Sequence, residues 1–247
     1  MKLLLTLILI SALSAQAIKK DLSDFERIKI NVPANTIIEF GNRNYIEIDG
    51  KEKLVKDVEV NVYGKTLEID MRDKNFFNDF FGWRKSQDMK IKIIAKKLNK
   101  IELNASGYCQ VDDLNSENFE VEINGSTDLR TGGKVNYMSV AIKGSGNVRF
   151  DELIGKEMEI SIRGSGDISA AGSYDLVDIE IKGSGDVEAY GLKSKVVNAS
   201  IYGSGDINIT ATEELDAKIY GSGDITYKGE PRRVRDKVYG SGDIARF

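Results

Sequence analysis

The feature of this 247-residue chain that most constrains its fold is a short glycine-rich phrase that returns at a nearly fixed interval. The residues YGSGDI begin at Tyr202, Tyr220 and Tyr239, and weaker forms precede them as NASGYC, NGSTDL, KGSGNV, RGSGDI and KGSGDV. The first glycines of the phrases follow one another at this interval and are Gly125, Gly144, Gly164, Gly183, Gly203, Gly221 and Gly240. Self-similarity at such a period is typical of repeat architectures.

Between the phrases, β-branched and polar residues alternate, as in Val177-Asp-Ile179-Glu-Ile181. This period of two predicts strands that bury one face. A repeat as short as the step from Gly125 to Gly144 has no room for a crossover helix between its strands. The sequence therefore predicts an all-β parallel β-helix (β-solenoid) over residues 105–247. We expect the coils to be right-handed, as parallel crossovers generally are.

Stacking of these coils should place equivalent residues above one another at about 4.8 Å. Two apolar series are then expected to form continuous internal ladders. One consists of Val148, Ile168, Val187, Ile207, Ile225 and Ile244, and the other of Ile123, Ile142, Ile162, Ile181, Ile201, Ile219 and Val238. Cys109 falls at an inward position, which predicts a buried and unreactive thiol.

The Gly-Ser-Gly-Asp phrase is predicted to be the corner at which each coil turns. Its glycines would allow positive φ, and its acidic side chain would cap backbone N–H groups one or two residues later. The corner residues in this role are Asp128, Asn147, Asp167, Asp186, Asp206, Asp224 and Asp243. Stacked carboxylates repel by roughly 0.9 kcal/mol per pair in water, so backbone donors, neighbouring cations or bound Ca²⁺ must compensate. Turn capping is the preferred interpretation, with calcium as the alternative and no other cofactor expected.

Residues 18–104 lack the phrase but keep strand-like alternation at irregular spacing. They are predicted to form irregular β coils, with the segment from Asp21 to Ile30 as a cap over the first coil. One domain continuous with the regular coils is the simpler interpretation, and two subdomains are the alternative. Residues 1–17, MKLLLTLILISALSAQA, have the charged start, short apolar run and A-x-A end of a signal peptide. The mature chain is therefore expected to be exported, with no transmembrane segment after cleavage.

One segment, residues 73–87, interrupts these strands with a concentration of aromatic side chains. They are Phe76, Phe77, Phe80, Phe81 and Trp83. The segment either folds back over the core, as apolar clusters usually do, or forms an exposed patch for a partner, a glycan or a membrane surface. A second candidate is the row of Tyr202, Tyr220 and Tyr239, which could contact sugar rings or serve as a structural stack.

Charge and composition exclude several classes of function. Removal of the signal with Lys2 leaves 34 Lys and Arg against 39 Asp and Glu, a balance that argues against nucleic acid as a partner. The chain has no histidine, which excludes imidazole-based metal sites and hydrolases of the Ser-His-Asp or Cys-His type. Its single cysteine cannot form an intramolecular disulfide, so stability must come from packing.

An exported chain with an irregular all-β first half and a second half of coils marked by GSG[DN] resembles the putative autotransporter adhesin head GIN domain family of exported bacterial proteins. The resemblance covers nearly all of the mature chain. It implies a right-handed parallel β-helix at the cell envelope and an adhesin-like role, and it brings no catalytic motif.

These observations favour a non-enzymatic protein of the periplasm, the outer-membrane surface or the extracellular space. It would bind a cell-surface or extracellular glycan or protein through a solenoid face or the aromatic segment. One alternative is a polysaccharide lyase or hydrolase, since β-helices carry such activities on carboxylates and Lys or Arg without histidine. Another is a purely structural envelope protein. Self-association through the ends or faces of the solenoid is also compatible with the sequence.

Overall fold

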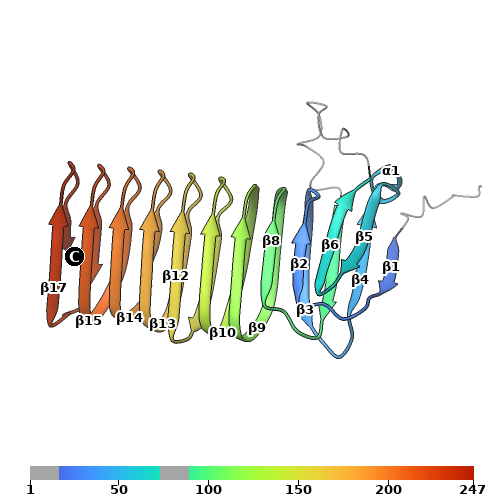
Figure 1. Cartoon of the computed structure of the whole chain (residues 1–247), viewed down its shortest axis with the longest axis horizontal. Helices are drawn as coiled ribbons and strands as arrows, with labels where there is room; N and C mark the ends of the chain where they lie inside the picture. The colour runs from blue at the N-terminus through green and yellow to red at the C-terminus, as the bar shows by residue number, and fades with distance from the viewer. Residues whose placement is uncertain (1–16, 73–88) are drawn as a thin grey trace, which may run out of the picture.

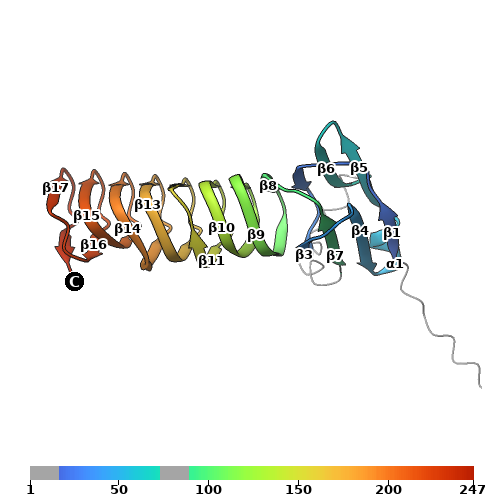
Figure 2. The ribbon, with the colours of Figure 1, turned by 90° about the horizontal axis from the view of Figure 1, so that it is seen from below.

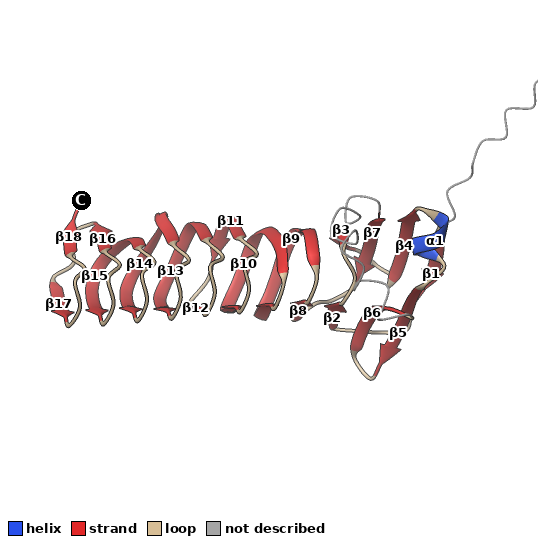
Figure 3. Ribbon diagram, turned by 90° about the horizontal axis from the view of Figure 1, so that it is seen from above, coloured by secondary structure: helices blue, strands red, loops and turns tan. Residues whose placement is uncertain are grey.

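The computed structural model of this chain describes residues 17–72 and 89–247, which form one 18-stranded sheet. The strands of the first part are β1 (Ile18–Asp21), β2 (Arg27–Ile30), β3 (Ala34–Phe40), β4 (Tyr45–Gly50), β5 (Val58–Tyr63), β6 (Thr66–Met71), β7 (Met89–Ala95) and β8 (Lys100–Leu103). Those of the second part are β9 (Ser106–Ile123), β10 (Ser126–Ile142), β11 (Val148–Ile154), β12 (Glu157–Ile162), β13 (Ile168–Ile181), β14 (Val187–Ile201), β15 (Ile207–Ile219), β16 (Ile225–Lys228), β17 (Arg233–Val238) and β18 (Ile244–Arg246). A single helical turn, α1 (Glu52–Val55), lies at the N-terminal end of the stack (Figure 3).

From β8 onward the chain winds into coils that stack along one axis (Figure 1). Each coil pairs in parallel with the next, and the pairing offset equals the spacing of the glycine phrases. Ile168, for example, pairs with Val187, which pairs in turn with Ile207. The predicted parallel β-solenoid is therefore confirmed.

The two predicted ladders lie in the core of the solenoid. In the second ladder, the side chains of Ile181, Ile201 and Ile219 are fully buried, while the last member, Val238, is 44% exposed. The inward side chains interlock along the axis, because each coil covers the apolar edge of its neighbour. The last coil has no such neighbour within the described chain, which explains the exposure of Val238.

The first part of the chain follows a more complex path than lead-in coils with a cap. β2 pairs in parallel with both β6 and β8, and β3 pairs in parallel with both β7 and β9. β2 and β3 thus form one coil. Strands that follow later in the chain pair with this coil on both sides, β6 and β7 on one side and β8 and β9 on the other. The prediction that Asp21–Ile30 caps the first coil was wrong, because β2 lies inside the stack, between β6 and β8, and contributes the buried Ile28 and Ile30 to the core.

Antiparallel pairing is confined to the N-terminal end of the structure. There β4 pairs antiparallel with β1 and β7, and β5 pairs antiparallel with β6. The β5–β6 hairpin projects beyond the side of the stack (Figure 2). No helix in residues 17–72 and 89–247 is long and apolar enough to cross a membrane.

The corner glycines are required for a different reason from the one predicted. The prediction of positive φ in the GSGD phrases was wrong: Gly107, in the faintest form NASGYC, is the one phrase glycine with positive φ in the described chain, and the other positive-φ glycines of the coils, such as Gly133 and Gly172, lie away from the phrases. A Cβ added at Gly221 would instead lie 1.8 Å from the carbonyl oxygen of Gly203, one coil earlier. From Gly144 onward the corners stack backbone on backbone, so a Cβ at either glycine of the phrase would clash with the preceding coil.

Candidate functional site

The corner carboxylates form a ladder of hydrogen bonds between coils. The Oδ1 atom of each residue accepts a hydrogen bond from the backbone N–H of its equivalent in the next coil, over distances of 2.7 to 2.9 Å. Asn147 takes part with its amide oxygen. The prediction that these side chains cap their own turn was wrong in its geometry, because the donor lies one coil away. The backbone donor partly offsets the repulsion between neighbouring carboxylates.

Calcium was the alternative compensation for this ladder. In the described part of the chain, no group of three or more acidic, Cys or His side chains is arranged to hold a metal ion. The backbone N–H groups already provide a positive partner for each carboxylate from Asp128 to Asp224. The ladder therefore has a structural explanation that does not involve a ligand.

The tyrosine row lies on the strand ends just before the corners. The rings of Tyr202 and Tyr220 stack with centroids 4.8 Å apart and an angle of 2° between planes, and those of Tyr220 and Tyr239 at 4.9 Å and 10°. Lys182 begins the row, with its Nζ 5.5 Å from the centroid of the Tyr202 ring. The rings cover one another and present mainly their edges to solvent. A sugar that stacks on an aromatic face would find such a face chiefly at Tyr239, which is 63% exposed.

The predicted aromatic segment, residues 73–87, lies outside the described residues, as does nearly all of the predicted signal peptide. In the chain, the segment joins the end of β6 to the start of β7. The role of its phenylalanines and of Trp83 stays a prediction.

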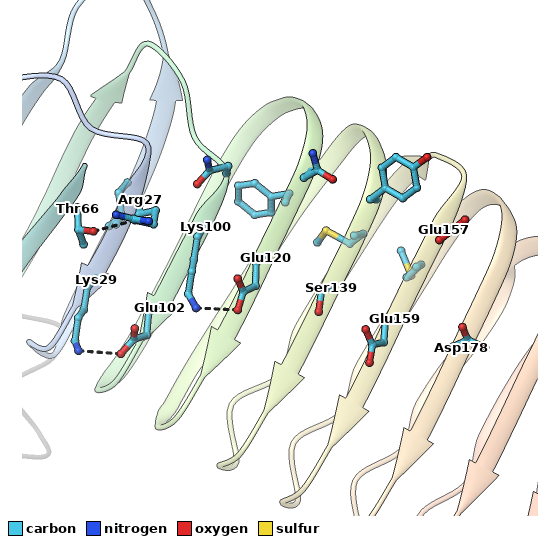
Figure 4. Close-up of a pocket in the computed structure, with 17 residues that line it drawn as sticks. Arg27, Lys29, Thr66, Lys100, Glu102, Glu120, Ser139, Glu157, Glu159 and Asp178 are labelled. Atoms are coloured by element: carbon cyan, nitrogen blue, oxygen red, sulfur yellow. Dashed lines mark hydrogen bonds and ion pairs between the residues drawn. The ribbon is translucent and has the colours of Figure 1, made fainter. Parts of the chain in front are cut away.

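A groove of about 810 Å³ runs across the outer face of the stack, over β2, β8, β9, β10, β12 and β13 (Figure 4). Its central row contains one outward residue from each of these strands, in the register of the sheet. The row is Arg27, Lys100, Glu120, Ser139, Glu159 and Asp178. These positions alternate with core residues such as Val121 and Ile160, which fixes the direction of the outward side chains.

The N-terminal half of the groove is rich in cations held by ion pairs. Lys29 contacts Glu102 at 3.1 Å and Lys100 contacts Glu120 at 2.8 Å (Figure 4). Hydrogen bonds to these carboxylates raise the pKa of both lysines. Arg27 completes this half and donates from its Nε to the Thr66 hydroxyl at 3.0 Å. Both lysines therefore remain charged at neutral pH.

The other half of the groove is acidic and has an aromatic edge. Glu157, Glu159 and Asp178 line it, and Glu159 and Asp178 are direct neighbours in adjacent coils (Figure 4). Tyr137 pairs with Glu157 in the sheet and is 39% exposed. The Nζ of Lys156 lies 5.8 Å from the Tyr137 ring centroid. The groove thus offers donors, acceptors, both signs of charge and the exposed ring of Tyr137 to a polar ligand.

The sequence did not lead us to this groove, although a signal for it was present. From Lys100 to Asp178 the residues of the central row recur at the same interval as the glycine phrases. Reading the outward positions in the register of the ladders would have placed them in one row. The contribution of Arg27 and Thr66 could not be read in this way, because the regular repeat does not extend to β2 and β6.

Cys109 is fully buried, as predicted, and burial raises the pKa of its thiol to about 12. The thiolate form, which is the reactive one, is therefore negligible at neutral pH.

Comparison with known proteins gives a consistent result. A putative adhesin from Parabacteroides merdae ATCC 43184 is 26% identical with a TM-score of 0.82, over 94% of this chain and 95% of that one. A structure titled putative lipid binding protein, from Parabacteroides distasonis ATCC 8503, is 27% identical with a TM-score of 0.84, over 94% and 96% of the two chains. A putative adhesin from Bacteroides fragilis NCTC 9343 is 26% identical with a TM-score of 0.64, over 94% and 97%. No curated protein matches the chain.

Residues 24–231 match a family defined by its sequence profile, and this range includes every residue that lines the groove. The match spans most of the chain, including the irregular first part and all but the last of the regular coils. The chain belongs to the family described as putative auto-transporter adhesin, head GIN domain.

Proposed function

We propose that this protein is an exported, non-catalytic, adhesin-like protein of the cell envelope that binds a glycan or the polar surface of a protein in the groove over β2 to β13. The observation that carries the proposal is the groove itself, which brings Arg27, Lys100, Glu159 and Asp178 from separate coils onto one face beside Tyr137. Its polar lining with an aromatic edge suits a hydroxylated or charged ligand better than an apolar one. Export rests on the signal-like residues 1–17.

Electrostatics in the groove favour binding over the alternative of polysaccharide cleavage. A glycosidase needs a carboxylic acid whose pKa is raised, and a lyase that uses lysine as its base needs a lysine whose pKa is lowered. The pKa of Lys100, in the groove, is raised by its hydrogen bond to Glu120. Glu122, which lies outside the groove lining but contacts Lys100 at 3.3 Å, has its pKa lowered by its hydrogen bond to Lys143. Both shifts keep these groups charged, which supports a role in recognition.

Lipid is the second candidate ligand, and a separate hollow favours it. About 520 Å³ in volume, this hollow lies over β3, β4, β7 and the start of β9, beside the 44% exposed side chain of Ile37. Ile91 and Tyr108 also line it, together with Lys90 and Lys92 and the acidic Glu47 and Asp49. Lys92 is ion-paired with Glu39 at 2.8 Å, so Lys90 is the cation proposed to contact an anionic headgroup. The structural neighbour from Parabacteroides distasonis ATCC 8503 is named a putative lipid binding protein, which supports including lipids in any search for a ligand.

The experiment is a binding screen of the purified chain on arrays of glycans, extracellular proteins and lipids. The groove variant combines Tyr137→Ala with Glu159→Gln. It should lose at least tenfold in affinity for any glycan or protein that the wild type retains, because it removes the aromatic edge and one carboxylate.

The matched control combines Tyr63→Ala with Glu213→Gln, which changes the same residue types at exposed positions outside the groove. It should bind like the wild type. Equal binding by the groove variant would refute the groove as the site. If the wild-type chain binds only lipids, and Ile37→Asp weakens that binding, the function belongs to the second hollow.

A further inference from the structure

We propose that the open C-terminal edge of the solenoid binds an acidic, extended segment of a partner protein, which adds to β17 as a further strand. Within the described chain β17 pairs with β15 on one side only. All six of its residues, Arg233–Val238, are exposed, and the strand forms the outermost member of the stack in Figure 1. It is an exposed strand edge of the kind that accepts another chain.

The free side of β17 presents backbone hydrogen-bonding groups in a regular order. Just after β17, Tyr239 donates its backbone N–H to the carbonyl oxygen of Ile219 in the preceding coil, at 2.7 Å. Successive residues of a parallel strand direct their backbone groups to opposite sides. The groups of Val234, Asp236 and Val238 therefore point away from β15, toward the open edge. An extended segment would satisfy them, as in β-augmentation.

Charge selects an acidic partner. The outward side chains of β17 are Arg233, Arg235 and Lys237. The two arginines form ion pairs with Glu214 of β15, at 3.0 and 3.7 Å. Residues 228–247 contain six Lys and Arg against three Asp and Glu, whereas residues 105–227 contain 10 against 21. A strand added to β17 would face this cationic row, so acidic residues at its alternate positions are favoured.

The inward positions define the rest of the partner. Val234 and Val238 are 39% and 44% exposed, because no coil covers them. Asp236 lies between them and pairs with the buried Ala217 of β15. A fitting segment therefore alternates acidic residues with an apolar, a small polar and an apolar residue. The segment needs to pair only with β17. If it continued over the corner at Gly240 and Gly242, it would need glycines there, because side chains would clash with the backbone beneath.

The same charges disfavour a second copy of this chain as the occupant. Two copies that met through their β17 edges would oppose outward cations to outward cations, whichever register they took. Like charges directly opposite each other destabilise a strand pair. The charged Asp236 at an inward position further discourages stacking on an apolar coil. The edge is thus protected against self-association and open to an acidic segment.

The test uses a fluorescent peptide of sequence Glu-Val-Glu-Thr-Glu-Val and the purified chain, with binding followed by fluorescence anisotropy at physiological salt. Two variants probe the two parts of the proposal. Arg235→Gln with Lys237→Gln removes charge, and Asp236→Pro removes one N–H on the open edge while leaving the bonds to β15. Lys195→Gln, which removes an exposed cation from the internal strand β14, is the matched control. Thermal melts establish that each variant folds.

We expect at least tenfold weaker peptide binding by both edge variants, no change in the control, and no binding of the peptide with lysine in place of glutamate. A peptide with alternate N-methylated residues should also fail to bind. The N-methylated peptide or polyglutamate could instead bind as tightly as the test peptide, with Asp236→Pro having no effect. The edge would then be a site for polyanions, and strand addition would be refuted. Absence of peptide binding would overturn the proposal, as would concentration-dependent self-association of the chain that Asp236→Pro abolishes.

Discussion

The Oδ1 atom of Asp206 accepts a hydrogen bond from the backbone N–H of Asp224, one coil later, at a distance of 2.7 Å. Asp224 repeats the arrangement with Asp243, and Asn147 does the same for Asp167 through its amide oxygen. The feature that these residues share is an acceptor at one position rather than a charge. The solenoid therefore uses its aspartates to connect coils.

Replacement of Asp206 separates the acceptor from the charge. Asp206→Asn should change the free energy of unfolding by only a few tenths of a kcal/mol, since the amide keeps the acceptor. Asp206→Ala should cost about 1 kcal/mol, because the N–H of Asp224 loses its partner. Urea unfolding of the three proteins, with and without calcium, provides the measurement. A calcium-dependent rise in melting temperature that Asp206→Asn abolishes would favour a metal at the corners instead.

The corner glycines give a second prediction. Gly221→Ala should destabilise the fold by about 3 kcal/mol or more, because its Cβ would meet the carbonyl oxygen of Gly203 at 1.8 Å. Gly132→Ala is the control, since there the nearest atom to the added Cβ lies at 3.4 Å. Chemical denaturation compares the two. Equal stability of the two variants would show that the corners do not stack as closely as described.

The fold was largely predictable because the repeat constrains it on several levels. The spacing of the glycines indicated the coil length, and the alternation around Ile181 and Ile201 indicated the inward face. What a single coil cannot reveal is how it contacts the next one. Positive φ at Gly203 was inferred from the usual role of glycine in turns, whereas the real constraint is the approach of a second backbone. The acceptor role of Asp206 toward another coil was missed for the same reason.

The first part of the chain and the groove were less predictable. Alternation identifies a strand but not its partners, so nothing in the sequence of β2 indicated that β6 and β8 flank it. The groove depends on this insertion of β2, because Arg27 reaches it from a strand that lies far before Lys100 in the chain. Reading the outward positions across the regular coils would have predicted Glu120, Glu159 and Asp178 as groove residues, but not the cations from β2.

The buried thiol yields a prediction about reactivity and pH. Because the pKa of Cys109 is raised to about 12, a thiol reagent at pH 8 should modify the native chain at least a hundredfold more slowly than the unfolded chain. The thiolate forms in the unfolded state near pH 9 and in the folded state near pH 12. This stabilising contribution is present below pH 9 and should decline by about 1.4 kcal/mol per pH unit between them. A Cys109→Ala chain should lack that decline, and rapid labelling of the native protein would contradict the assignment.

The aromatic segment can be tested without a ligand. If Phe81 and Trp83 form an exposed patch, their replacement by Ser should leave the melting temperature nearly unchanged and weaken attachment to the cell surface. If they cover the core, each change should cost about 3 kcal/mol or more. Thermal melts of the double variant distinguish these outcomes. A strongly destabilised variant would remove the segment from the candidate binding sites.

A crystal structure of the chain with the ligand found in the binding screen decides whether the groove between Arg27 and Asp178 holds that ligand. We expect ligand density along the outer face of β2, β8, β9, β10, β12 and β13, with the ligand in contact with Tyr137 and Glu159. Density at residues 73–87 or on the Tyr202 row, with the groove empty, would contradict it.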